Sequence, residues 1–127
     1  MPASNYEFGF DQLRSISEST GNDAAYVQWF KDRAIDYAGR AAAKIRKISA
    51  LSTPGDPGEV WGDHCNPEYE LRRAKATLTA LEERLDESVS FFENKPLIAK
   101  PLKEALERVK SLRHEVKDDL KKAEKWF

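Results

Sequence analysis

The chain of 127 residues contains a single cysteine and no long apolar run. One cysteine excludes an intramolecular disulfide framework and any zinc site built from paired cysteines. The longest apolar run, Ala-Ala-Tyr-Val at 24–27, is far shorter than the roughly 20 residues that cross a bilayer. The first residues also lack the basic start and apolar stretch of a signal peptide, so we expect a cytoplasmic protein with no membrane contact.

An excess of charge of either sign is also missing. The 21 Lys and Arg residues nearly balance the 22 Asp and Glu residues, and a net charge of -1 gives no global argument for nucleic acid or membrane binding. Charged residues make up 34% of the chain, above the usual ~25%, and hydrophobic residues make up 40%. This balance is typical of a helical bundle with a thin core, and the length fits one domain over 1–127.

Apolar residues at helical spacing predict a long central helix over 23–51. Trp29, Ile35 and Ala42 lie off its main apolar stripe, so this helix is apolar on more than one side and is expected to contact several others. A short N-terminal helix that contains Leu13 is expected to end at Gly21. The main stripe of the central helix consists of Val27, Phe30, Ala34, Tyr37, Ala38, Ala41, Ile45 and Ile48.

A long antiparallel helical hairpin is predicted over 67–127. Its first helix begins cleanly, with Asn66 as cap and Pro67 at the first helical position, and ends near 94–96. Its second helix is expected to begin by Pro101 and to run to the C-terminus. Leu71, Leu78 and Leu85 recur every seven residues, as in a coiled coil. The fold class is therefore all-α: a small helical bundle in which this hairpin packs on the helix at 23–51.

The segment 52–66 is predicted to be a long Pro/Gly-rich loop. Trp61 in this loop is a candidate binding residue, because tryptophan buries a large area at low entropic cost. Asp63, His64 and Cys65 are the residue types of a nucleophilic or metal site, but adjacent residues rarely converge on one atom. We therefore interpret them as part of an ordinary loop, and we expect neither a catalytic residue nor a cofactor.

The distribution of charge predicts a basic end of the bundle. If the helices at 23–51 and 67–127 pack antiparallel, basic residues at the end of the first meet those at the start of the second. Nearby acids, among them Glu68 and Glu70, favour local neutralisation, and a functional patch is the alternative. The candidate binding residues at this end are Arg40, Lys44, Lys47, Arg72, Arg73 and Lys75.

Acidic residues cluster on both helices of the predicted hairpin, at Glu82, Glu83, Asp86, Glu87, Glu104 and Glu107. Their spacing is distantly similar to that of the magnesium-binding acids in all-α nucleotide pyrophosphohydrolases. The seven-residue repeat, however, directs most of these carboxylates away from the seam, and a metal site needs ligands that converge. A solvated acidic face is the favoured interpretation, and we assign no family.

These observations support three hypotheses about function. The favoured one is a small non-catalytic interaction module, an adaptor, inhibitor or assembly component, that binds another protein through the 52–66 loop and the basic end. A nucleic-acid-binding helical protein is the alternative, and a magnesium-dependent nucleotide hydrolase ranks third. The small residues of the helix at 23–51 let another helix approach closely, which leaves both an internal partner and a homo-oligomer open.

Overall fold

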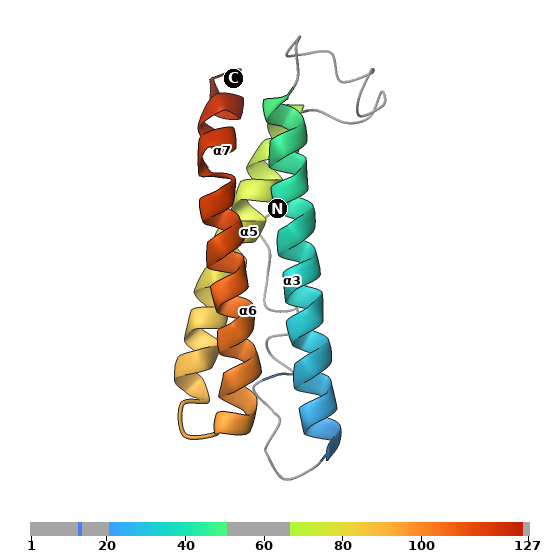
Figure 1. The fold of residues 1–127 in the computed structure, drawn as a ribbon, viewed down its shortest axis with the longest axis vertical. Helices are drawn as coiled ribbons and strands as arrows, with labels where there is room; N and C mark the ends of the chain where they lie inside the picture. The colour runs from blue at the N-terminus through green and yellow to red at the C-terminus, as the bar shows by residue number, and fades with distance from the viewer. Residues whose placement is uncertain (1–12, 14–20, 51–66, 126–127) are drawn as a thin grey trace.

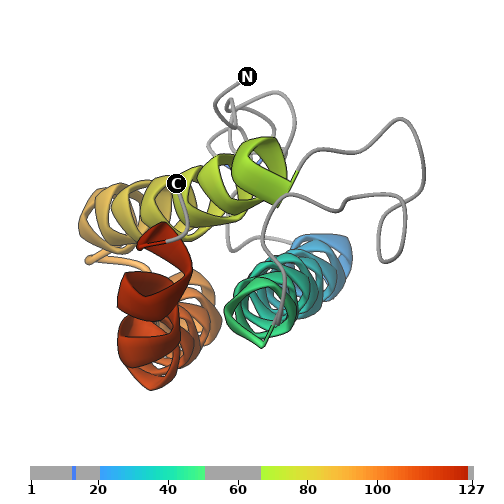
Figure 2. The same ribbon diagram turned by 90° about the horizontal axis from the view of Figure 1, so that it is seen from above.

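The computed structural model describes residue 13 and residues 21–50 and 67–125, and the regular elements of these ranges are all α-helices. α5 and α6 form an antiparallel hairpin, and α3 packs against both (Figure 1). Seen from above, α3, α5 and the pair formed by α6 and α7 lie at the corners of a triangle (Figure 2). The predicted all-α bundle is confirmed. Its helices are α3 (Gly21–Ser49), α5 (Pro67–Phe91), α6 (Pro96–Glu115) and α7 (Lys117–Glu124).

α3 is the central helix, because α5, α6 and α7 all pack on it. The residues of its predicted main stripe are buried, except Tyr37, which is half-buried. The helix begins at Gly21, so this glycine opens α3 rather than ending the helix before it. Asp23 in the first turn suits the positive end of the helix dipole. The predicted N-terminal helix and the loop at 52–66 lie outside the described residues, but Leu13 is fully buried in the core.

Small residues let three helices approach α3 closely. Ala34, Ala38, Ala41 and Ala42 are all buried within the bundle. The close approach that these residues permit is therefore used inside the chain. Ala43, by contrast, is exposed.

The hairpin turn lies earlier than the sequence predicted. α5 ends at Phe91, the Lys95 N–H donates to the Phe92 carbonyl at 2.8 Å, and α6 begins at Pro96. Pro101, the expected start of the helix, lies inside it. Proline has no N–H to donate to the carbonyl of Leu97 four residues earlier, and α6 continues through Pro101 without that hydrogen bond.

The last predicted helix is not continuous. It bends at Val116, whose backbone lies at φ -99° and ψ 8° between α6 and α7. The bend keeps its hydrogen bonds, since Val116 N–H donates to Leu112 and Leu120 N–H donates to Val116, at 3.1 and 2.8 Å. α7 packs on α3, where Ser49 Oγ donates to Asp119 at 3.0 Å. Packing against the central helix therefore accounts for the change of direction.

The seam of α5 contains one polar side chain, Ser88, at a position that the seven-residue repeat assigns to the core. Ser88 is fully buried, and its hydroxyl has no hydrogen-bond partner among the described residues. A buried hydroxyl without a partner costs about 1–3 kcal/mol, because it loses water and gains nothing in exchange.

We expect Ser88→Ala to raise the free energy of unfolding by about 1 kcal/mol, because the change removes a buried, unpartnered hydroxyl. Alanine is also the better helix former. Ser90→Ala is the matched control: Ser90 is exposed, so only the propensity gain of a few tenths of a kcal/mol applies. Urea denaturation of both variants measures the difference. A loss of stability in Ser88→Ala contradicts the prediction and indicates that the hydroxyl has a hydrogen-bond partner in solution.

Candidate functional site

Five of the six predicted basic residues line one of two grooves on the surface of the bundle. Arg40, Lys44 and Arg73 line a groove between α3 and α5. Arg72 and Lys75 line a second groove, together with Glu68, Leu71 and Glu124. Lys47 is exposed near the end of α3, and Trp61 lies outside the described residues.

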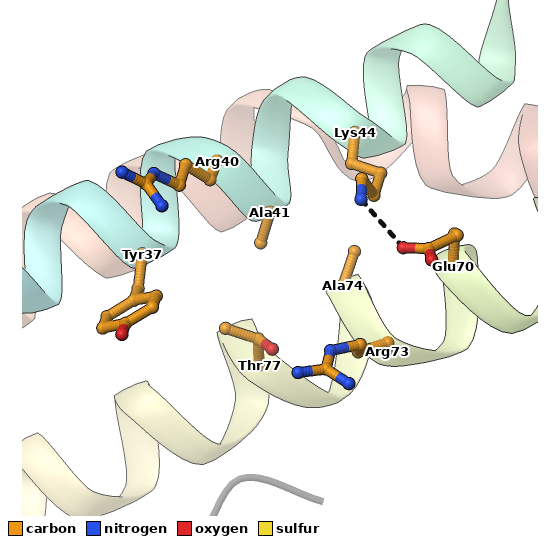
Figure 3. Close-up of a pocket in the computed structure, with 8 residues that line it drawn as sticks. All are labelled: Tyr37, Arg40, Ala41, Lys44, Glu70, Arg73, Ala74 and Thr77. Carbon is orange, nitrogen blue, oxygen red and sulfur yellow. Dashed lines mark hydrogen bonds and ion pairs between the residues drawn. The ribbon is translucent and has the colours of Figure 1, made fainter. Parts of the chain in front are cut away.

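The groove between α3 and α5 exists because small side chains meet where the two helices pack. Ala41 and Ala74 face each other there, at 7% and 4% exposure, and leave a cavity volume of about 170 Å³ (Figure 3). Such a volume is below the ~300 Å³ at which small-molecule pockets begin, so the groove fits a single side chain or small ion. We call it the α3/α5 groove; it is lined by Tyr37, Arg40, Ala41, Lys44, Glu70, Arg73, Ala74 and Thr77.

Ion pairs fix several of the cations in and around the α3/α5 groove. Lys44 Nζ lies 2.8 Å from Glu70, across the two helices (Figure 3). Arg40 uses its Nε for Asp36, at 3.0 Å on the same helix. Glu68 likewise pairs with Arg72 at 2.8 Å, so both of these α5 acids neutralise a nearby cation, as their position in the sequence indicated. Exposed pairs of this kind are worth about 0–1 kcal/mol each.

Among the described residues, basic side chains outnumber acidic ones at the end of the bundle where α3 ends, α5 begins and α7 lies (Figure 1). Ion pairs connect different helices there, such as Lys75 with Glu124 at 2.9 Å and Arg46 with Glu115 at 3.7 Å. We call this region the basic end. Its described basic residues are Arg40, Lys44, Arg46, Lys47, Arg72, Arg73, Lys75, Lys117, Lys121, Lys122 and Lys125, and its described acids are Asp36, Glu68, Glu70, Glu115, Asp118, Asp119 and Glu124.

A stack of aromatic rings and an arginine runs along α3 toward the groove, a feature that the apolar stripe and the charge distribution do not predict. The Arg33 guanidinium lies over the Trp29 ring at 5.1 Å and over the Tyr37 ring at 5.4 Å. Arg33 Nη2 also donates to the Tyr37 hydroxyl at 3.2 Å, and Tyr26 packs beside Trp29 with ring centroids 5.5 Å apart. We call Tyr26, Trp29, Arg33 and Tyr37 the α3 stack.

The signal for the α3 stack is present in the sequence as an aromatic–arginine–aromatic series at spacings of four residues, which places the three side chains on one helix face. Trp29 remains 49% exposed although Tyr26 and Arg33 pack against it. The pKa of the Tyr26 hydroxyl is raised above its ordinary value of 10.0, because the effect of burial is larger than the opposing effect of the Arg33 charge. The stack therefore presents one positive charge between neutral rings.

Some of the acids of the hairpin pair with cations. Glu82 pairs with Arg113, and Arg84 lies 3.3 Å from Glu87. In the part of the chain that the structure describes, no group of three or more His, Cys, Asp or Glu side chains is arranged to hold a metal ion. Asp63, His64 and Cys65 lie outside those residues. Glu83, Asp86, Glu87 and Glu107 are exposed on the hairpin surface.

One further pair, Lys31 with Glu104, connects α3 to α6 at 2.5 Å. The hydrogen bond and the charge of Lys31 lower the pKa of the Glu104 carboxyl from its ordinary value of 4.5. A folded-state pKa below the unfolded one stabilises the fold at pH values above the unfolded pKa. That contribution is lost as the pH falls through the folded pKa.

We expect Glu104→Gln to lower the melting temperature slightly at pH 7, and the difference from the wild type to vanish as the pH falls below the folded pKa of Glu104. Glu107→Gln is the control, because Glu107 is exposed and forms no ion pair with the described residues. Thermal unfolding between pH 2 and pH 7 tests this. A difference that stays constant over this range contradicts a role for the charge of Glu104.

No described helix is long and apolar enough to cross a membrane. Comparison of the chain with protein-family models, with curated proteins and with solved structures finds no match in any of the three. The fold and the two features above, the basic end with its α3/α5 groove and the α3 stack, are therefore the basis for any statement about function.

Proposed function

We propose that the protein is a small non-catalytic module that binds another protein through the basic end of its bundle. The observation that carries the proposal is the juxtaposition of the α3/α5 groove with the α3 stack on adjoining turns of one helix. Tryptophan, tyrosine and arginine are the residue types that dominate the energy of protein–protein interfaces. The 52–66 loop, with Trp61, remains part of this proposal.

Ordering of these side chains in the free protein also favours binding. Arg33 is held between two rings and Arg40 by Asp36, so both have lost part of their rotamer freedom before a partner arrives. Immobilising such a side chain at an interface costs about 0.5–1.5 kcal/mol, and pre-ordering reduces this cost. An adaptor, inhibitor or assembly component is the class of protein that uses such a surface.

A nucleic-acid-binding function is the second candidate, favoured by the excess of basic residues at the same end. Acids lie among these cations, however, and Asp36, Glu68 and Glu70 each pair with one of them. A polyanion loses affinity on such a mixed surface, because it meets repulsion wherever an acid interrupts the row of cations. Protein is therefore the partner that we propose.

Affinity capture from the native lysate tests the proposal. The tagged full chain is incubated with lysate, with and without nuclease, and washed at low and at high salt. We expect a protein in stoichiometric amount that survives all these conditions. Material lost on nuclease treatment or at high salt overturns the proposal in favour of the nucleic-acid candidate, because phosphate contacts weaken steeply with salt. Capture of nothing at all also overturns it.

A further inference from the structure

A larger cavity lies where α6 bends into α7, on the side that faces α5 (Figure 1). Its volume is about 340 Å³, which is twice that of the α3/α5 groove. Small-molecule sites begin at about 300 Å³, so this cavity is large enough for an organic ligand. We call it the bend cavity; among the described residues it is lined by Glu82, Lys110, Arg113, His114, Lys117 and Leu120.

The charges of the bend cavity are mainly positive. Lys110, Arg113 and Lys117 carry one positive charge each. Glu82, the one carboxylate among the described lining residues, pairs with Arg113. Lys110, His114 and Lys117 form no ion pair with any described residue. Two ammonium groups and an imidazole are therefore left without a counter-charge in one cavity.

Helix geometry brings these three groups to one face. Lys110 and His114 are four residues apart on α6, and Lys117 follows three residues later at the start of α7. Side chains at such spacings are neighbours, about 5–6 Å apart at Cβ. The bend keeps this spacing, because Val116 N–H donates to the Leu112 carbonyl at 3.1 Å. His114 thus lies between two lysines on flexible stems, and an anion bound at the imidazole is within reach of both.

Repulsion within the cluster also favours an anion. Arg113 and Lys117 are four residues apart, and like charges at this spacing destabilise a helix. A phosphate monoester carries about 1.5 to 2 negative charges at pH 7 and three strong acceptor oxygens. It therefore matches two lysines and an imidazole donor better than a carboxylate, which has one charge and two oxygens.

Leu120 is the apolar part of the lining. Its side chain is half-buried and packs against the hydrophobic core of the bundle. An inorganic ion leaves this surface in contact with water, whereas an organic group attached to the anion covers it. The volume of the cavity and its apolar wall thus favour an organic ligand over a bare ion.

We propose that the bend cavity binds a small organic phosphate monoester, with the phosphate on Lys110, His114 and Lys117 and the organic group on Leu120. The inference does not depend on the proposed function, because it requires no protein partner. The cations are exposed, so we expect millimolar affinity for a simple monoester.

The direct test is a nuclear magnetic resonance titration of the full chain with phenyl phosphate, and with benzyl alcohol as the uncharged control. We expect phenyl phosphate to shift the backbone amides at 110–120 and the ring signals of His114, and benzyl alcohol to leave them unchanged. Inorganic phosphate is expected to bind at least about threefold more weakly, because it leaves Leu120 uncovered. Shifts spread over all exposed lysines, or equal affinity for inorganic phosphate, overturn the inference.

A twelve-residue oligothymidylate distinguishes a monoester site from a surface for nucleic acid. Each phosphate diester carries one charge and has both of its ester oxygens blocked, so we expect it to compete poorly at equal phosphate concentration. Displacement of phenyl phosphate by the oligonucleotide under these conditions overturns the inference in favour of nucleic acid.

Variants of the bend cavity provide the second test. K110Q/K117Q is expected to weaken phenyl phosphate binding at least about fivefold, because two charge-assisted contacts are lost. K103Q/K122Q is the matched control, with the same change of net charge at exposed positions of α6 and α7 outside the lining. H114A repeats the test if K110Q/K117Q fails to fold, which circular dichroism detects. Unchanged binding by a folded cavity variant, or an equal loss in the control, overturns the inference.

Discussion

Phe92→Ala is expected to lower the free energy of unfolding by about 3–5 kcal/mol, which is a large part of the total stability of a domain of this size. Phe92 follows α5 directly and is 1% exposed, at the closed end of the hairpin. Its carbonyl accepts the Lys95 N–H at 2.8 Å, so the backbone at Phe92 is fixed where the chain reverses. Truncation removes buried ring surface and leaves a cavity that the tight turn cannot collapse to fill.

The neighbouring residue supplies the control for this prediction. Phe91 is 58% exposed, and its ring meets that of Phe92 edge-on with centroids 4.8 Å apart. Phe91→Ala therefore loses this contact and little buried area, and we expect a cost of about 1 kcal/mol. Thermal and urea denaturation of both variants measure the two effects. Equal losses in the two variants contradict the burial that distinguishes the rings.

The course of α3 and α5 follows from apolar spacing, because each buries a continuous stripe against its neighbours. The start of α6 lies earlier than the sequence predicts, because a proline such as Pro101 is typical of a helix start. Extending the stripe of Leu102 backward by four residues reaches Ile98, which is 2% exposed and lies in α6. The apolar spacing thus indicates that the helix includes residues before Pro101, and α6 accommodates this proline in its interior.

The bend at Val116 has no comparable signal in the sequence. Val116 is in register with the apolar stripe and is buried, as the spacing of the stripe indicates. The change of direction depends on how α7 meets α3, including the hydrogen bond between Ser49 and Asp119. Such a tertiary contact between residues distant in the chain is not visible in local periodicity.

The candidate site, like the fold, has features that the sequence predicts and features that depend on tertiary packing. The basic residues could be placed at one end from charge and helix order alone. Which of them share a groove depends on the register of α3 against α5, which brings Ala41 to Ala74 and separates Arg73 from Arg72. The α3 stack depends on side-chain rotamers, although the four-residue spacing of Trp29, Arg33 and Tyr37 in the sequence places them on one helix face.

The small residues of α3 left two possibilities open, an internal partner or a second copy of the chain. Their burial beneath α5, α6 and α7 leads to the second large effect, at Ala38, which is 0% exposed. Leucine and alanine have similar helix propensities, so an Ala-to-Leu change reports mainly on the space around the side chain. Ala43, on the same helix but exposed, allows the same substitution without a neighbour to displace.

Ala38→Leu is therefore expected to lower the free energy of unfolding by about 1–3 kcal/mol, because the larger side chain forces the packed helices apart. Ala43→Leu should stay within about 0.5 kcal/mol of the wild type. Urea denaturation measures both effects, and sedimentation of each variant reports its oligomeric state. A wild-type stability for Ala38→Leu, together with disruption of an oligomer, places the small residues at an interface between copies and contradicts their role inside the bundle. Loss of stability in Ala38→Leu alone, at an unchanged oligomeric state, means that the small residues of α3 serve close packing within the single chain.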